Sequence, residues 1–316
     1  MRWLPVTDLT LCQAAAMRMA AVLVTVLLWS SSFVGIRAEH SLSAGSLAAG
    51  RLVVGSVVLG ALVLVRREAF PARAALPRIA ACGVLWFGLY NLALNEAEHQ
   101  LDAGVAALLV YLAPLVIVLL AGLLLKEGFP RFLLAGCAIA FAGTVLIGLA
   151  TARYRTGDGW GVALALVAAL GYAGGVVVQK PLLRDTSALQ VTWLACVAGT
   201  IVCLPFLPGL VSQLPRLPGP AIGWLVYLGV GPTAIAFTTW AFALSRTSLG
   251  AMAAITYLVP PLTVLLGWIV LRELPPPLAL AGGAVCLAGA ALATVVRPAR
   301  APGLPIDPMR TREESP

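Results

Sequence analysis

Long runs of apolar residues, separated by short polar gaps, dominate the chain from residue 17 onward. A helix needs about 20 apolar residues to cross the hydrocarbon core of a bilayer, and ten stretches reach that length. They lie at 17–36, 44–65, 77–97, 103–125, 131–150, 159–179, 187–207, 220–244, 247–271 and 277–296. The pattern predicts an all-α integral membrane protein with ten transmembrane helices.

One part of this pattern occurs twice. Residues 104–143 and 250–289 align without a gap at a constant offset of 146, and 17 of the 40 aligned positions are identical. The identities include Tyr111/Tyr257, Pro114/Pro260, Glu127/Glu273 and Gly143/Gly289. An internal duplication in an apolar chain indicates a membrane protein built from two halves, an arrangement typical of transport proteins.

The amino-acid composition indicates that the protein is surrounded by lipid. Hydrophobic residues make up 60% and charged residues 11% of the 316 residues, whereas a soluble domain carries about 25% charged residues. The net charge is +8, but the Arg and Lys residues lie in short gaps between apolar runs and form no extended basic face. The composition and the placement of the charges therefore argue against a nucleic-acid partner and predict membrane lipids as partners.

The positive charges also predict an orientation. With a cytoplasmic N-terminus, 15 of the 21 Lys and Arg residues fall in cytoplasmic segments, five fall outside, and Arg51 falls within a span. This bias follows the positive-inside rule and predicts a multi-pass protein of the cell (inner) membrane with both termini in the cytoplasm. Because each copy has five spans, the second copy must insert upside down relative to the first.

The predicted organisation has four parts. An N-terminal cytoplasmic segment (1–16) precedes a first repeat (17–151, spans 1–5) and a second repeat (157–297, spans 6–10), and a disordered cytoplasmic tail (298–316) follows. The first residues are not a convincing signal peptide, because Asp8 and Gln13 interrupt their apolar character. Translation could begin at Met1, Met17 or Met19.

No motif for bond chemistry stands out. The six cysteines show no CxxC spacing and the chain has two histidines, so a His/Cys metal site, a cofactor and catalytic residues are not expected. An intramembrane enzyme would need an imidazole at membrane depth, and His99 is the plausible one, with no evident Ser or Cys partner. The sequence is therefore interpreted as that of a non-enzyme.

Several short motifs resemble a known family in their order along the chain. They are Trp29-Ser30-Ser31-Ser32-Phe33-Val34 in the first span, Gly50-Arg51-Leu52 in the second, and a Tyr-Leu-x-Pro element followed by a basic residue and Glu in the fourth and ninth spans. Over about 17–296 the chain resembles the EamA-type transporters of the drug/metabolite transporter superfamily. Ser31 and Ser32 stand where the family has a small residue and Asn.

The resemblance implies a secondary active transporter, often an exporter of an amino acid, metabolite or drug-like solute. With no nucleotide-binding motif in the chain, an ion gradient or the solute's own gradient would supply the energy. The alternative is a translocase for lipids or lipid-linked solutes with the same fold. The expected partners are a small-molecule substrate and membrane lipids, and a homodimer is left open.

Two repeated pairs and two first-span residues are candidates for the substrate pathway. Pro114 and Pro260 bend their spans, as a hinge or site wall or as a static kink. Tyr111 and Tyr257 precede them on the same helical face, where they line the pathway or pack against neighbouring helices. Trp29 and Ser32 come from the first-span motif, and Trp29, Trp86, Tyr90, Trp193 and Trp240 form an aromatic pocket or pack in the core.

The other candidates belong to the first half alone. Arg51 lies within its span, where a charge needs a protein or water partner; it serves the pathway, an ion pair or substrate binding, or it extends to the outer headgroups. Asn91, Asn95, Glu98 and Asp102 share one helix face. We hypothesise that this stripe lines an outward vestibule, although interfacial loop residues and an interhelical hydrogen bond explain it too.

The repeated ends of spans four and nine carry further polar residues. Glu127 and Glu273 follow Lys126 and Arg272, and local salt bridges or turn stabilisation are a simpler role for them than proton coupling. In spans five and ten, the spacings Gly136…Gly143 and Gly282…Gly289 favour close helix packing, between the halves or between protomers.

Overall fold

The computed structural model describes residues 6–39, 41–100, 109–151, 159–272 and 274–294, and within them the chain forms helices and no strand. The first half contains α1 (Val6–Ala38), α2 (Ala44–Arg66), α3 (Leu76–Cys82), α4 (Tyr90–Gln100), α6 (Ala113–Leu124) and α7 (Arg131–Thr151). The second half contains α8 (Gly159–Leu182), α9 (Ala188–Val202), α10 (Leu207–Gln213), α11 (Gly219–Leu228), α12 (Ala236–Leu244), α13 (Leu249–Ile255), α14 (Val259–Leu271) and α15 (Pro277–Thr294). Short connecting helices are η1 (Arg73–Ala75), η2 (Gly83–Leu89), η3 (Leu204–Phe206), η4 (Leu214–Arg216), η5 (Gly229–Ile235) and η6 (Thr256–Leu258).

Eight helices of the described residues are long and apolar enough to span a membrane. They are Gln13–Ala38, Ala44–Arg66, Arg73–Ala97, Arg131–Ala150, Gly159–Leu182, Gly219–Leu244, Leu249–Leu271 and Pro277–Thr294. A ninth candidate consists of Ala188–Val202 and Leu204–Arg216, which meet at a bend of 55°. Prolines at 205 and 208 explain this bend, because proline cannot continue the hydrogen-bond ladder of the preceding helix.

The predicted count of ten spans is not confirmed. The predicted fourth span, 103–125, is represented among the described residues by α6, which has 12 residues. Pro114 lies in the first turn of this helix, a position where its missing N–H is tolerated. The helix α1 begins at Val6, within the predicted N-terminal segment 1–16. The predicted tail 298–316 lies outside the described residues.

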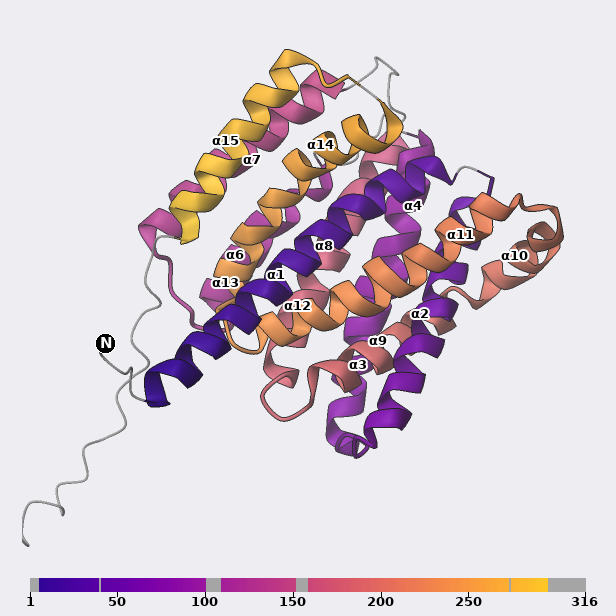
Figure 1. Ribbon diagram of the computed structural model, residues 1–316, viewed down its shortest axis with the longest axis horizontal. Coiled ribbons are helices and arrows are strands. Elements are labelled where there is room, and N and C mark those ends of the chain that lie inside the picture. Colours follow the sequence, from indigo (N-terminus) through magenta and orange to yellow (C-terminus); the bar gives the residue numbers. More distant parts are fainter. Residues whose placement is uncertain (1–5, 40, 101–108, 152–158, 273, 295–316) are drawn as a thin grey trace, which may run out of the picture.

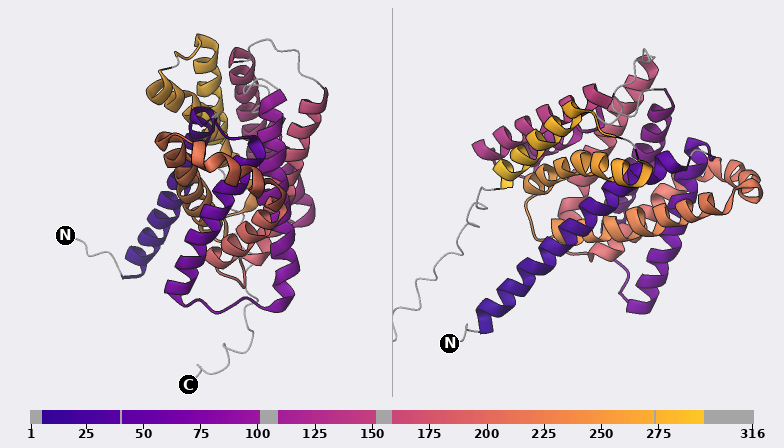
Figure 2. Two further views of the ribbon diagram at one scale, coloured as in Figure 1. Left: turned by 90° about the vertical axis from the view of Figure 1, so that its right-hand side faces the viewer. Right: turned by 45° about the horizontal axis from the view of Figure 1, so that its top comes forward.

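Helix α1 lies between two helices of the second half of the chain. It packs against α12 and α14, and in Figure 1 it runs between these two helices. The core around it contains large, fully buried side chains, among them Trp86, Trp240 and Tyr257. Figure 2 shows from two further sides that helices from both halves of the sequence interleave in one bundle.

Two of the candidate spans, Arg73–Ala97 and Gly219–Leu244, each contain a wide helical turn. The η2 and η5 segments are π-helical, with backbone hydrogen bonds that reach one residue farther than in an α-helix. They begin at Gly83 and Gly229, which are separated by the same 146 residues as the aligned duplicate. In η5, Pro232 has no backbone N–H to donate, which is consistent with a locally widened ladder.

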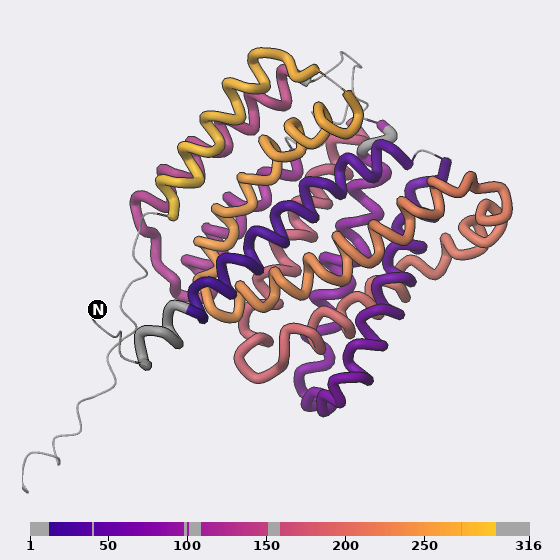
Figure 3. Tube along the Cα trace, in the orientation of Figure 1, coloured from indigo at the N-terminus to yellow at the C-terminus, as the bar shows by residue number. Residues whose placement is uncertain are grey.

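Helices α7 and α15 form the closest pair in the bundle and lie side by side along one edge (Figures 1 and 3). A Cβ added at Gly136 would lie 2.6 Å from the carbonyl oxygen of Gly289, and one at Gly143 would lie 2.6 Å from that of Gly282. The earlier glycine of α7 contacts the later glycine of α15, and the later glycine of α7 contacts the earlier one of α15. The two helices therefore run antiparallel. The glycine spacing therefore packs the two halves of the chain against each other.

Glu127 caps the start of α13. Its Oε1 accepts a hydrogen bond from the backbone N–H of Leu249 at 2.8 Å, and its Oε2 accepts one from Gly250 at 3.0 Å. A carboxylate at this end satisfies backbone donors that lack a partner within the helix. This geometry agrees with the expected role of Glu127 in stabilising a turn at the end of its span. The equivalent Glu273 lies outside the described residues.

Replacing Glu127 by alanine is expected to lower the free energy of unfolding by about 1–2 kcal/mol, because two backbone donors lose a charged acceptor. Thermal unfolding of the purified protein in detergent measures this change. Glu96→Ala is the matched control, because Glu96 is exposed and accepts a bond from Gln100 four residues along the same helix. Equal stability of the two variants would contradict the capping role.

Candidate functional site

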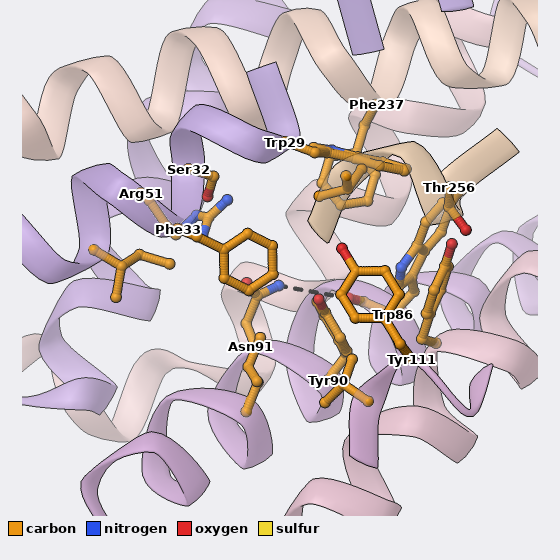
Figure 4. A pocket seen from close by; sticks show the side chains of 15 residues that line it. Trp29, Ser32, Phe33, Arg51, Trp86, Tyr90, Asn91, Tyr111, Phe237 and Thr256 are labelled. Carbon is orange, nitrogen blue, oxygen red and sulfur yellow. Dashed lines mark hydrogen bonds between the residues drawn. The ribbon is translucent and has the colours of Figure 1, made fainter. Parts of the chain in front are cut away.

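A cavity of about 60 Å³ lies between the two halves of the chain. Side chains from α1, α2, η2, α4, the residues just before α6, α8, α12, η6 and the first residue of α14 surround it (Figure 4). The lining residues are Trp29, Ser32, Phe33, Ile36, Arg51, Trp86, Tyr90, Asn91, Leu94, Val110, Tyr111, Tyr172, Phe237, Thr256 and Val259. A few ordered waters or one small solute group would fill this volume.

One end of the cavity is polar. Arg51 comes from α2 and is 5% exposed, and its Nε donates a hydrogen bond to Thr233 Oγ1 at 3.1 Å. Thr233 in turn donates to the carbonyl oxygen of Leu228 at 2.8 Å, across the wide turn η5. The guanidinium is thus held by the second half of the chain and does not extend to the outer surface. Ser32 lies at the same end (Figure 4).

Asn91 connects this polar end to the other wide turn. Its Nδ2 donates to the carbonyl oxygen of Phe87 at 2.8 Å and lies 3.5 Å from that of Trp86, both in η2. A wide turn shifts backbone bonds, so a nearby carbonyl oxygen becomes available to a side chain. The two polar residues Arg51 and Asn91 are therefore each joined to a π-helical segment, Arg51 through Thr233.

The other end of the cavity is aromatic. The ring of Trp86 lies 6.0 Å from Trp29, 4.8 Å from Phe237 and 5.4 Å from Tyr172, measured between ring centroids. Trp29 and Phe237 lie 5.4 Å apart. These distances are in the range of favourable edge-to-face and stacked pairs. The cluster joins α1, η2, α8 and α12 into one apolar wall.

The repeated tyrosines meet at the cavity but differ in exposure. Tyr111 lines it, whereas Tyr257 is fully buried behind it. The hydroxyl of Tyr257 donates to the backbone carbonyl oxygen of Tyr111 at 3.2 Å, and their ring centroids lie 6.4 Å apart. Of this pair, Tyr111 alone presents its side chain to the cavity, and Tyr257 positions it.

The structure brings half of the predicted pathway residues to the cavity. Trp29, Ser32, Arg51, Asn91 and Tyr111 line it. Pro114 and Pro260 are buried in the first turns of α6 and α14 and do not line it, because the helices break ahead of them. Asn95 is buried and donates to the carbonyl oxygen of Ala44 at 3.1 Å.

The predicted polar stripe is therefore divided. Asn91 reaches the cavity, Asn95 forms an interhelical bond to α2, and the side chains of Glu98, His99 and Asp102 lie outside the described part of the chain.

The aromatic candidates also fall into two groups. Trp86 and Tyr90 line the cavity, whereas Trp240 is buried and donates to Gln179 Oε1 at 3.2 Å, and Trp193 packs at Gly60.

Sequence reasoning did not single out eight of the lining residues. They are Phe33, Ile36, Leu94, Val110, Tyr172, Phe237, Thr256 and Val259. The offset of 146 contained a usable signal for some of them. Phe237 is the counterpart of Asn91, and Thr256 is the counterpart of Val110, so both members of each pair line the cavity.

Asn91 and Asn95 allow a direct comparison of a cavity residue with a structural one. Asn91→Ala is expected to lower the transport rate more than Asn95→Ala, because Asn91 both lines the cavity and holds η2. Solute flux into vesicles, normalised to the amount of inserted protein, measures the difference. Unchanged flux in Asn91→Ala at normal membrane levels would remove Asn91 from the pathway.

Comparison with known proteins identifies the family. A model described as the EamA-like transporter family matches residues 17–149 and again residues 159–295. The chain is 38% identical over 278 residues to the "Probable terminal-alkyne amino-acid exporter" of Streptantibioticus cattleyicolor, covering 86% of this chain and 91% of that protein. It is 25% identical to the "Probable amino-acid metabolite efflux pump" of Salmonella typhimurium, covering 70% and 78%.

The fold has a counterpart among solved structures. A crystal structure described simply as that of a protein superimposes with a TM-score of 0.73 at 23% sequence identity, covering 89% of this chain and 97% of that chain. At this identity the likeness shows a shared fold. With several membrane-spanning helices, and with both halves of its sequence matched by the family model, the chain belongs to the EamA-like transporter family.

Proposed function

We propose that this protein is a secondary active transporter that exports a small metabolite, amino acid or drug-like solute across the inner membrane by alternating access. The observation that carries this proposal is the cavity between the two halves, lined by residues from both. Transporters with inverted repeats place their substrate site at such an interface, near the middle of the membrane. The names of the two relatives, an amino-acid exporter and an amino-acid metabolite efflux pump, agree with this class of solute.

The contacts between the halves support an inverted repeat. A Cβ at Gly136 would meet the carbonyl oxygen of Gly289 at 2.6 Å, and a Cβ at Gly289 would meet that of Gly136 at 2.6 Å. Gly143 and Gly282 repeat this exchange at 2.6 and 2.7 Å. Gly282 and Gly289 are the offset-146 counterparts of Gly136 and Gly143, so Gly136 contacts the counterpart of Gly143, and Gly143 contacts the counterpart of Gly136. Such reciprocal contacts are the mark of a twofold relation.

The proposed topology has ten spans with both termini in the cytoplasm. The fourth span is the one that contains α6, and the seventh is the bent pair of α9 with η3, α10 and η4. In this topology the bonds of Lys180 lie on the cytoplasmic side, where its Nζ donates to the carbonyl oxygens of Leu244 and Thr247 at 2.6 Å each. These two bonds, and the bond that Glu127 accepts from the start of α13, join the cytoplasmic ends of neighbouring helices. In the proposed mechanism these bonds must break when the cavity opens inward.

Purified protein in vesicles tests the proposal. Vesicles loaded with unlabelled amino acids or related metabolites are expected to accumulate the labelled form of a substrate by exchange, whereas vesicles without protein should not. The same vesicles carry a fluorescently labelled phospholipid in one leaflet. Lipid transfer between leaflets without flux of any soluble solute would contradict the proposal and favour a lipid translocase.

A further inference from the structure

A second, narrower hollow, the seam, adjoins the cavity at Trp29. It lies among side chains of α1, α12, α13 and η6 and has no room for a water molecule. Its lining residues are Val22, Thr25, Val26, Trp29, Trp240, Met252, Ile255 and Thr256. Trp29 and Thr256 line the cavity as well. The cavity therefore continues into the seam at these two residues.

The seam runs toward the start of α1. Along this helix the cavity is lined by residues within 29–36 and the seam by residues within 22–29. Along α12 the cavity is lined by Phe237 and the seam by Trp240. Figure 1 shows the turn between α12 and α13 beside the first part of α1. In the proposed topology the seam therefore leads from the cavity toward the cytoplasm.

The indole of Trp29 separates the two hollows. Its ring centroid lies 5.4 Å from that of Phe237 on the cavity side and 5.1 Å from that of Trp240 on the seam side. One helical turn before it, Thr25 is 1% exposed, and its Oγ1 forms a hydrogen bond of 2.8 Å with Thr239 Oγ1 of α12. Six of the eight seam residues are apolar, and a closed apolar constriction excludes water and polar solutes. The seam is shut in this structure.

The hairpin of α12 and α13 forms the other side of the seam and is bounded by irregular helix at both ends. The wide turn η5 precedes α12, and the 3-10 helix η6 follows α13. Both interrupt the regular α-helical ladder, and such interruptions within a helix are frequent at hinges and functional sites. The chain therefore has a bending point on each side of residues 236–255, so the hairpin can move as a unit.

Two charged side chains from outside the hairpin hold its tip. Lys180 of α8 donates to the carbonyl oxygens of Leu244 and Thr247 at the end of α12. Glu127 accepts from the backbone N–H groups of Leu249 and Gly250 at the start of α13. Hydrogen bonds to charged groups are roughly twice as strong as those between neutral groups. These bonds stabilise the closed position of the hairpin.

Resting on the proposed function, we propose that the seam is the inward half of the solute route and that Trp29 is the residue that closes it. To open the seam, the α12–α13 hairpin bends at η5 and η6 away from α1. The bonds of Lys180 and Glu127 break, and Trp240 separates from Trp29. The solute then passes Trp29 on its way from the cavity into the seam.

The reactivity of a cysteine in the seam tests this route and needs no solute. Val26 lines the seam and is 4% exposed, so Val26→Cys reports when water enters. The full-length protein in nanodiscs is treated with 2-sulfonatoethyl methanethiosulfonate, a charged reagent that modifies thiols in contact with water. Every variant carries Cys12→Ser, because the side chain of Cys12 lies outside the described part of the chain. The five remaining native cysteines are buried and set the background.

Lys180→Met is expected to raise the labelling rate of Val26→Cys at least about tenfold, because loss of a charged donor shifts the equilibrium between closed and open hairpin by a factor of this size. Arg184→Met is the matched control. It removes an exposed cation four residues farther along the chain and should leave the labelling rate unchanged.

Glu127→Gln covers the case in which Lys180→Met does not fold. It weakens the bonds on the other side of the tip and should also raise the labelling rate. An unchanged rate in whichever of the two variants folds overturns the hairpin as the inner gate.

Trp29→Ala tests the closing residue. Removal of the indole joins the cavity to the seam, so the labelling rate of Val26→Cys should rise although Lys180 and Glu127 still hold the hairpin. Trp193→Ala deletes the same atoms from a half-buried position on α9 that lines neither the cavity nor the seam. Equal labelling rates in Trp29→Ala and Trp193→Ala would show general loosening and overturn the role of Trp29.

Flux is measured separately, with the exchange assay in vesicles. Labelling that rises in Lys180→Met without flux of any solute would refute transport and leave the opening of the seam intact. Flux through a protein whose seam never becomes accessible would overturn the route and leave transport intact.

Discussion

Replacing Trp86 by alanine is expected to lower the free energy of unfolding by about 3–5 kcal/mol, the cost typical of removing a large buried aromatic side chain. Trp86 is 2% exposed and contacts the rings of Trp29, Tyr172 and Phe237. Because lipid is as apolar as the protein core, helix association in a membrane depends on close packing and not on exclusion of water. Loss of this side chain leaves a hole where four helical segments meet. Chemical or thermal unfolding in detergent, followed by circular dichroism, measures the loss.

Trp268→Ala is the matched control for this prediction. Trp268 lies on α14 and is 46% exposed, so its removal deletes the same atoms from the surface that faces lipid or detergent. A small change in Trp268→Ala beside a large one in Trp86→Ala confirms the packing argument. Similar values for both would show that the aromatic cluster does not hold the bundle together. Flux should also fall in Trp86→Ala, because Trp86 lines the cavity.

Gly289→Ala is expected to destabilise the protein by about 2 kcal/mol or more, although it adds a single methyl group. The new Cβ would lie 2.3 Å from the backbone nitrogen of Ala140 and 2.6 Å from the carbonyl oxygen of Gly136. Both contacts are with backbone, which cannot turn aside as a side chain can. Helices α7 and α15 must therefore separate, and the contact between the two halves of the chain weakens. Thermal unfolding and the yield of monodisperse protein measure the effect.

Gly223→Ala makes the same change where space is open. Gly223 lies within α11, and a Cβ there would meet nothing within 4 Å. Alanine is a better helix former than glycine by about 1 kcal/mol, so this variant is expected to be as stable as the parent or more so. If Gly289→Ala is no less stable than Gly223→Ala, the close approach of α7 and α15 does not contribute to the fold.

The length of the apolar runs located most of the helices, because a membrane span is a local property of the chain. Twenty apolar residues in a row are sufficient for a helix in lipid, where every backbone group must be bonded within its own segment. The predicted ranges 44–65 and 131–150 accordingly match α2 and α7 closely. Hydropathy does not report where a helix bends or widens. The 55° bend after α9 and the wide turns η2 and η5 were therefore not predicted.

The candidate site could be predicted in part. Arg51 and Asn91 stood out because a polar group inside an apolar span is costly and needs a reason, and both reach the cavity. Pro114 and Pro260 stood out because they repeat, yet the structure places them at helix starts behind the cavity. An apolar residue such as Phe237 does not stand out by polarity, and its repeat relation to Asn91 was the signal that pointed to it. Its neighbours in space, Trp29 and Trp86, lie far from it along the chain.

The sequence by itself determined that the protein is helical, that it belongs in a membrane and that part of it is duplicated, because composition, run length and internal identity are properties of the chain alone. Tertiary structure alone decided which residues share a cavity. Arg51 meets Thr233 across 182 positions, and Tyr257 meets Tyr111 across 146. Such contacts follow from the way helices pack, which depends on the fit of side chains on all faces at once and is not encoded in the period of any one span.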